Sequence, residues 1–125
     1  MTATITFFRN ASDATPYPAG TVIFRDGDPG HEMFIVVEGE VEIRIGDVVV
    51  DVVGPGGIFG EMAIIDAAPR SATAIARVDA KLVAVAQKRF MFLLQQTPQF
   101  AIQVMRIMTD RLKRKDPAHG PSASA

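Results

Sequence analysis

The feature that most constrains the fold is a change in the spacing of apolar residues near Gln87. From Gly20 to about Ala86, short apolar runs are separated by turns that contain glycine and aspartate. After Gln87 the apolar residues recur at helical spacing. Short strands at such intervals, followed by helices, predict an antiparallel barrel or sandwich rather than a βαβ fold.

Six β-type runs can be located from the pattern alone. The clearest is 41–45, where Val41, Ile43 and Ile45 alternate with polar residues. Pro16 and Pro18 stiffen the approach to the first run. The predicted strands are residues 21–24, 33–37, 41–45, 48–53, 73–77 and 82–86.

The helical part divides into two segments. Phe90, Leu93 and Leu94 form one face of a short helix, and Thr97 with Pro98 suits the start of a second. The apolar stripe of the second helix comprises Phe100, Val104, Ile107, Met108 and Leu112. Its basic last turn, 111–115, is interpreted as a solvated end that complements the helix dipole. We also expect a short helix within 5–10 and a disordered tail over 116–125.

Composition excludes several classes of function. The 125 residues suit one domain, and the absence of cysteine excludes disulfides and thiolate metal sites. A net charge of −1 gives no general case for nucleic-acid binding. No signal peptide is visible and no apolar run approaches the ~20 residues of a membrane segment, so we expect a cytoplasmic protein.

Catalytic parts are also scarce. The chain has two histidines, one of them in the tail, so a cupin-like metal site lacks ligands. No Ser/His/Asp or Cys/His arrangement is available for nucleophilic catalysis. We therefore expect no enzyme activity, no catalytic residues, no metal and no cofactor.

The stretch GGIFGEMAIIDAAPRSATAIA, residues 56–76, carries the strongest chemical signal. Gly60 and Glu61 precede Arg70 and Ser71 by about ten residues, with a turn-and-helix segment between them. Backbone N–H groups after a glycine face an anion, and a guanidinium neutralises it. A carboxylate repels a phosphate, so it suits a neutral donor such as a ribose hydroxyl. The segment therefore predicts a site for a small sugar phosphate.

Two segments resemble the cyclic nucleotide-binding domain family of catabolite activators, protein kinase A regulatory subunits and cyclic-nucleotide-gated channels. They are GTVIFRDGDPGHEMFIVVEGEVEI, residues 20–43, and FGEMAIIDAAPRSAT, residues 59–73. The resemblance implies a mainly β fold, an eight-stranded antiparallel, jelly-roll-like β roll followed by two C-terminal helices. It covers 16–115, with 1–15 as a lead-in and 116–125 as a tail.

The resemblance also implies roles for individual residues. Glu61 matches the carboxylate that accepts a hydrogen bond from the ribose 2′-hydroxyl, and Arg70 matches the arginine that pairs with the cyclic phosphate. Ser71 favours cAMP over cGMP as the ligand, although its hydroxyl could also serve a guanine amino group. The predicted ligand-binding residues are Phe59, Gly60, Glu61, Met62, Ala63, Arg70, Ser71 and Ala72.

The implied function is a cyclic nucleotide sensor whose C-terminal helices move when the ligand binds. Met105, Met108 and Leu112 are candidates to cap the base. No helix-turn-helix follows the second helix in this sequence, so we expect output through a protein partner or a homodimer formed by that helix. The alternative is an interaction domain that keeps the fold without binding nucleotide.

Overall fold

The computed structural model describes residues 13–115. The helix expected within 5–10 and the tail expected over 116–125 lie outside the described residues. The elements are β1 (Thr15–Tyr17), β2 (Val22–Phe24), β3 (Glu32–Glu38), β4 (Val41–Ile45), β5 (Val48–Val53), β6 (Ile58–Phe59), α1 (Met62–Ile65), β7 (Thr73–Ala76), β8 (Ala80–Ala86), α2 (Gln87–Gln96) and α3 (Pro98–Lys115).

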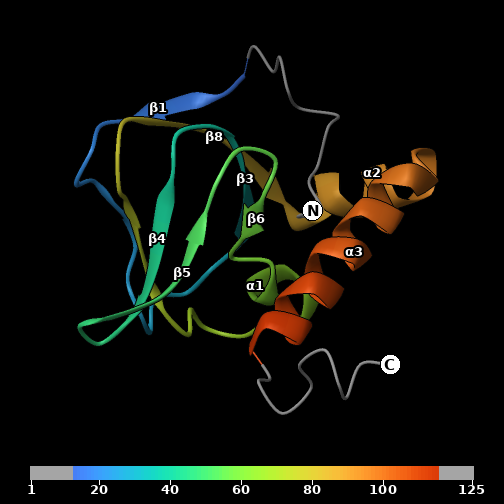
Figure 1. Cartoon of the computed structure of the whole chain (residues 1–125). Helices are drawn as coiled ribbons and strands as arrows, with labels where there is room; N and C mark the ends of the chain where they lie inside the picture. The colour runs from blue at the N-terminus through green and yellow to red at the C-terminus, as the bar shows by residue number, and fades with distance from the viewer. Residues whose placement is uncertain (1–12, 116–125) are drawn as a thin grey trace.

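The eight strands form two four-stranded antiparallel sheets. One has the order β1-β8-β3-β6 and the other β2-β7-β4-β5. The sheets close into a roll, with α2 and α3 packed to one side of it (Figure 1). The predicted eight-stranded antiparallel roll with C-terminal helices is confirmed.

Two strands have no counterpart in the sequence pattern. β1 contains Pro16, which the pattern places in the approach to the first strand. However, β1 lies at a sheet edge, where a missing N–H is tolerated. β6 has only Ile58 and Phe59 and pairs with β3. A two-residue strand is too short to show an alternation, so its existence depends on tertiary pairing.

β3 has both faces covered, because it lies between two apolar clusters. Met33 and Ile35 face the helices, in a cluster with Phe100 of α3. Phe34 and Val36 point into the roll and pack in the second cluster. This double burial explains why Met33–Val36 is a continuous apolar run rather than an alternation.

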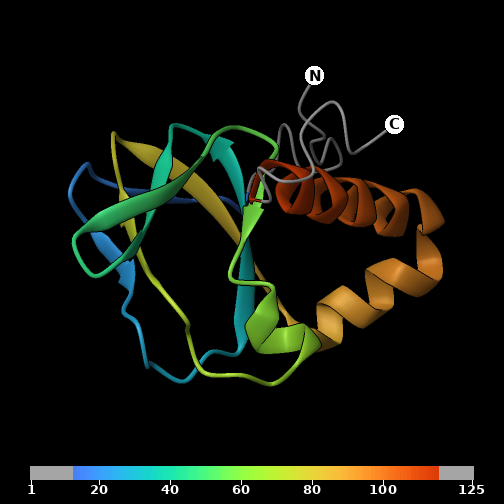
Figure 2. The same cartoon turned by 60° about the horizontal axis from the view of Figure 1, so that its bottom comes forward.

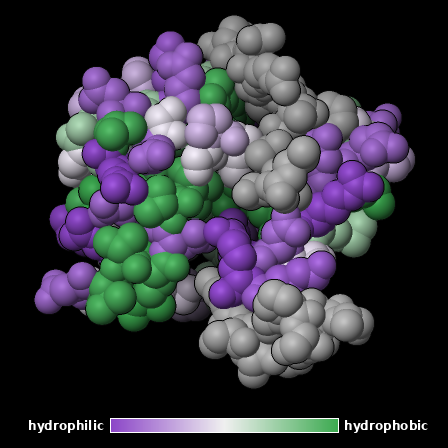
Figure 3. Space-filling view, viewed as in Figure 1, coloured by the Kyte–Doolittle hydropathy of each residue, from purple (hydrophilic) through white to green (hydrophobic). Residues whose placement is uncertain are grey.

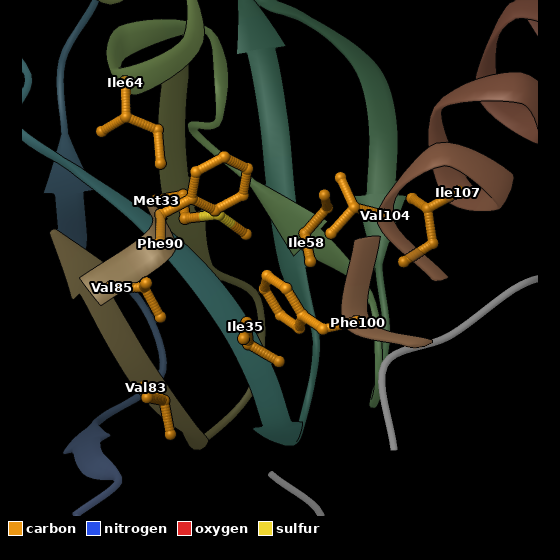
Figure 4. Packing of buried hydrophobic residues seen from close by; sticks show 10 residues of the cluster. All are labelled: Met33, Ile35, Ile58, Ile64, Val83, Val85, Phe90, Phe100, Val104 and Ile107. Carbon is orange, nitrogen blue, oxygen red and sulfur yellow. The ribbon is translucent and has the colours of Figure 1, made fainter. Parts of the chain in front are cut away.

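The helices attach to the roll through aromatic and aliphatic packing. Phe90 and Phe100 meet edge to face with ring centroids 5.9 Å apart, and Phe100 is fully buried. Figure 4 shows both rings among side chains of β3 and β8, with Val104 and Ile107 contributed by α3. In Figure 2, α2 leads away from β8 and α3 returns toward the roll. This return brings the C-terminal turns of α3 back to the strands.

The β4–β5 hairpin carries an exposed apolar area. Ile45, Val48, Val49 and Val50 are exposed there, and they correspond to the green surface at the lower left of Figure 3. Asp51 follows them in β5 but is largely buried. Within residues 13–115, no helix is long and apolar enough to cross a membrane.

Candidate functional site

The segment that connects β6 to β7 forms a turn, the short helix α1 and a return strand. The segment begins at Gly60, whose φ of 76° is a backbone conformation that residues with a side chain rarely adopt. A Cβ at this position would also lie 2.7 Å from Nη1 of Arg70. The glycine therefore allows the chain to turn sharply while the arginine approaches its backbone.

A cavity of about 530 Å³, including its opening to solvent, lies beside this segment. All eight predicted ligand-binding residues line it, namely Phe59, Gly60, Glu61, Met62, Ala63, Arg70, Ser71 and Ala72. The other lining residues are Phe24, Ile43, Asp51, Val53, Pro69 and Arg111.

Arg70 is buried at one end of the cavity, with 8% of its surface exposed. Its Nη1 donates to the Gly60 carbonyl at 2.9 Å, and its Nη2 donates to the Glu32 carbonyl at 2.7 Å. Its Nε is buried without a partner. The two bonds fix the orientation of the guanidinium. Because both acceptors are neutral carbonyls, they leave its positive charge uncompensated.

Neighbouring side chains hold the Arg70 guanidinium in place. Its Cζ lies 4.1 Å from the centroid of the Phe24 ring, within cation–π distance. A Cβ at Gly30 would lie 2.5 Å from Arg70 Nε and 2.7 Å from the Ala63 Cβ. Gly30 lies between β2 and β3, and its missing side chain leaves room for the arginine.

The electrostatics of Arg70 suit an anion. Among residues 13–115, no carboxylate lies within ion-pair distance of its guanidinium. Burial lowers the pKa of the Arg70 guanidinium, and more distant Glu32, Asp28 and Glu61 act in the opposite direction. An arginine stays protonated in proteins despite such burial. The site therefore offers a fixed positive charge at neutral pH.

Glu61 is also buried, with 5% of its surface exposed, but it has a cationic partner. Nη1 of Arg111, on α3, donates to Glu61 Oε1, and Nη2 donates to the Ile58 carbonyl at 2.5 Å. A direct pair between Glu61 and Arg70 is thus not realised. The partner comes from an element fifty residues away in the sequence.

Asp51 contributes a second carboxylate to the same end of the cavity. Its Oδ2 lies 3.7 Å from Nε of Arg111, and its Oδ1 accepts from the Val52 backbone N–H at 2.9 Å. A bulge in the β4–β5 pairing places Asp51 opposite Ile43 and Val49 opposite Arg44. The available sequence signal is an aspartate inside an otherwise apolar strand.

The structure corrects one interpretation of α3 and bears on another. The sequence pattern assigns Arg111 to a solvated helix end, but its side chain is only 18% exposed because it points into the cavity. The candidates to cap a base do not line the cavity: Met105 and Leu112 are exposed, and Met108 packs against the core. Arg111 is the α3 residue that reaches the cavity.

Comparison with known proteins settles the family. Residues 14–97 match the family model described as the cyclic nucleotide-binding domain. This chain belongs to the cyclic nucleotide-binding domain family. The match contains both β sheets, the cavity segment and α2, whereas α3 with Arg111 follows it.

Individual relatives agree with that assignment. A cyclic nucleotide-gated potassium channel of Mesorhizobium japonicum is 43% identical over 70% of this chain and 24% of the channel. A cyclic AMP receptor protein of Thermus thermophilus is 32% identical over 80% of this chain and 49% of the receptor. The chain therefore spans a quarter to a half of these relatives.

A solved structure covers nearly the whole of both chains. It is described in connection with a cyclic-GMP-dependent signalling pathway that regulates bacterial phytopathogenesis. The TM-score is 0.74 at 30% identity, with 90% of this chain and 97% of the other covered. The fold of the cyclic nucleotide-binding family thus extends into α3.

Proposed function

We propose that this domain is a cyclic nucleotide sensor that favours cAMP over cGMP. The observation that supports the proposal is Arg70, whose buried guanidinium lies at the wall of the cavity. Its Nε has no partner, and no carboxylate among residues 13–115 forms an ion pair with the guanidinium. A buried charge needs compensation, and a cyclic phosphate supplies one negative charge.

In this proposal the two halves of the nucleotide bind to opposite ends of the segment that joins β6 to β7. Arg70 pairs with the exocyclic oxygens of the phosphate, and the backbone of residues 60–63 lies along the ribose and phosphate. The carboxylate of Glu61 accepts the hydrogen bond of the ribose 2′-hydroxyl. Ser71 lines the cavity next to Arg70 and faces the base without excluding adenine.

The known relatives point to both nucleotides. The Thermus relative is named for cyclic AMP, whereas the structural neighbour is described with cyclic GMP signalling. Ser71 favours cAMP, because this position resembles that of cAMP-binding members of the family. Because its hydroxyl could also accept from a guanine amino group, the preference for cAMP is expected to be modest.

The output of the sensor is proposed to pass through the C-terminal helices. Ligand binding repositions α2 and α3, and it can do so only through a higher affinity for one helix position. Ile102, Met105 and Leu112 are exposed on α3 and offer an apolar stripe for a protein partner or a second copy of the chain. Sedimentation with and without nucleotide tests the second copy.

A second candidate is an interaction domain that has kept the fold and lost the ligand. The arrangement of Arg70 weighs against it, because a lost site would not maintain an uncompensated buried cation.

Calorimetric titration with cAMP and cGMP tests the proposed function directly. The protein is first unfolded and refolded to remove any carried-over nucleotide. Binding of at least one nucleotide that is lost in Arg70→Gln supports the sensor. A folded protein that binds neither nucleotide refutes it and favours the interaction domain.

A further inference from the structure

The ion pair between Arg111 and Glu61 links the ligand site to α3. Arg111 reaches across the cavity from the last turns of the helix and bonds both Glu61 Oε1 and the Ile58 carbonyl. Glu61 lies immediately before α1, and its carbonyl accepts the backbone N–H groups of Ile64 and Ile65. The backbone of Glu61 is therefore fixed by α1, while its carboxylate is fixed by α3.

The charges around the cavity show why the site needs this arginine. Asp51 and Glu61 both line the cavity, and two buried carboxylates would repel an incoming phosphate. Arg70 forms an ion pair with neither of them, because its bonds go to backbone carbonyls. Arg111 lies between the two carboxylates and offsets their charge. The charge of Arg70 is thus left for an anion.

The bond also leaves Glu61 able to accept another donor. A carboxylate has two oxygens with about four acceptor positions, and Arg111 occupies Oε1. A ribose hydroxyl can bond the remaining acceptor positions without displacing the guanidinium. With its direction fixed by Arg111, the carboxylate loses less conformational freedom when the hydroxyl arrives.

We propose that Arg111 is a positioning residue for the nucleotide site. It orients Glu61 toward the ribose, offsets the charge of Asp51 and Glu61, and seats α3 across the cavity through the same bonds. Ribose binding and the seating of α3 are therefore coupled through one carboxylate. This inference rests on the proposed function and adds a residue that lies beyond the family match, which ends at residue 97.

A double-mutant cycle tests whether Arg111 acts through Glu61. Affinity for cAMP is measured in wild type, Arg111→Gln, Glu61→Gln and the double variant. Each single variant is expected to weaken binding about tenfold or more, the range of a lost hydrogen bond to a charged group. If Arg111 acts through Glu61, the second substitution adds less than about threefold, because coupled residues are not additive.

Arg114→Gln is the matched control. Arg114 lies one turn further along α3, is 54% exposed, and approaches the same Asp51 at 3.5 Å without contacting Glu61. The Arg114→Gln substitution removes the same charge from the same helix. The affinity of this variant for cAMP is expected to stay within about twofold of wild type. An Arg114 variant as weak as the Arg111 variant would reduce the effect to helix charge and overturn the inference.

The ligand 2′-deoxy-cAMP separates positioning from direct contact. It lacks the hydroxyl that Glu61 accepts, so Arg111→Gln is expected to weaken its binding much less than that of cAMP. Equal losses for the two ligands, or additive losses in the cycle, would mean that Arg111 contacts the nucleotide directly or only supports the fold. Either result overturns positioning through Glu61.

Hydrogen exchange of α3 tests the seating separately from binding. Without added nucleotide, amides of residues 104–112 are expected to lose protection in Arg111→Gln and to keep it in Arg114→Gln. Equal protection in both variants overturns the seating of α3 by Arg111. If wild type binds neither nucleotide, the proposed function fails, and with it the positioning role; the exchange result then decides the seating alone.

Discussion

The two arginines that line the cavity have opposite surroundings. Arg70, in the segment between β6 and β7, donates to backbone carbonyls and has no ion pair among residues 13–115. Arg111, on α3, lies between the carboxylates of Asp51 and Glu61. The charge of Arg70 is therefore available to a ligand, whereas the charge of Arg111 is offset by carboxylates of the protein. A buried arginine is thus a ligand-binding candidate when carbonyls, rather than carboxylates, hold it.

The largest effect is expected from Arg70→Gln. Loss of the charge partner of a buried phosphate costs about 2–5 kcal/mol, which corresponds to a loss of about thirtyfold or more in affinity. Calorimetry with cAMP measures it. If Arg70→Gln binds as well as wild type, Arg70 is not part of the ligand site.

A smaller effect is expected from Gly30→Ala. The new Cβ would lie 2.5 Å from Arg70 Nε, so the guanidinium must shift from its place above Phe24. We expect about a tenfold loss of cAMP affinity, measured by the same calorimetry, since a displaced charge weakens its pairing steeply in a buried site.

Gly54→Ala is the control for that prediction. Gly54 has no positive φ, and no atom lies within 4 Å of the position that an added Cβ would take, so the affinity for cAMP should stay within about twofold of wild type. Equal affinity for cAMP in both glycine variants would show that Arg70 has room to move.

Phe24→Leu sharpens the account of how Arg70 is held. It keeps an apolar side chain under the guanidinium but removes the ring whose centroid is 4.1 Å from Cζ. Cation–π contacts are worth about 0.5–2 kcal/mol, so the affinity for cAMP should fall about threefold. The same substitution should leave the protection of α3 in hydrogen exchange unchanged, because Phe24 packs in the cluster inside the roll and not in the one that contains the α3 side chains.

The smallest effect concerns ligand choice at Ser71. Ser71→Ala should leave cAMP affinity within about twofold of wild type and weaken cGMP about threefold, since the hydroxyl is proposed to accept from the amino group of guanine. Competition between the two nucleotides for each variant provides the ratio. A loss of cAMP affinity with unchanged cGMP would reverse the proposed role of this residue.

The sequence predicted the Arg70 end of the site far better than the Arg111 end. Glu61 and Arg70 lie in one short segment, and their spacing and residue types are visible without knowledge of the fold. The pattern places Arg111 in a solvated basic end, because its neighbours Lys113 and Arg114 are indeed exposed. Its partners Asp51 and Glu61 are distant in the sequence, so only tertiary packing brings them together.

The elements of the fold likewise divide into those that local sequence predicts and those that depend on tertiary pairing. The alternation of 41–45 and the helical stripe after Gln87 predicted their elements, because one face of each is solvated. β6 has two residues, and β1 contains a proline, so neither carries a periodic signal. Both strands depend on pairing with a neighbour, which local pattern cannot supply.

Thermal unfolding of wild type, Arg70→Gln and Arg111→Gln, each with and without saturating cAMP, tests the central claim most directly. The account predicts that Arg70→Gln unfolds near the wild-type temperature without ligand but is no longer stabilised by cAMP. It predicts that Arg111→Gln unfolds at a lower temperature without ligand, because Glu61 is left unpaired, and is still partly stabilised by cAMP. The reverse pattern, with Arg70→Gln fully stabilised by cAMP and Arg111→Gln unchanged in its ligand-free unfolding temperature, would contradict the account.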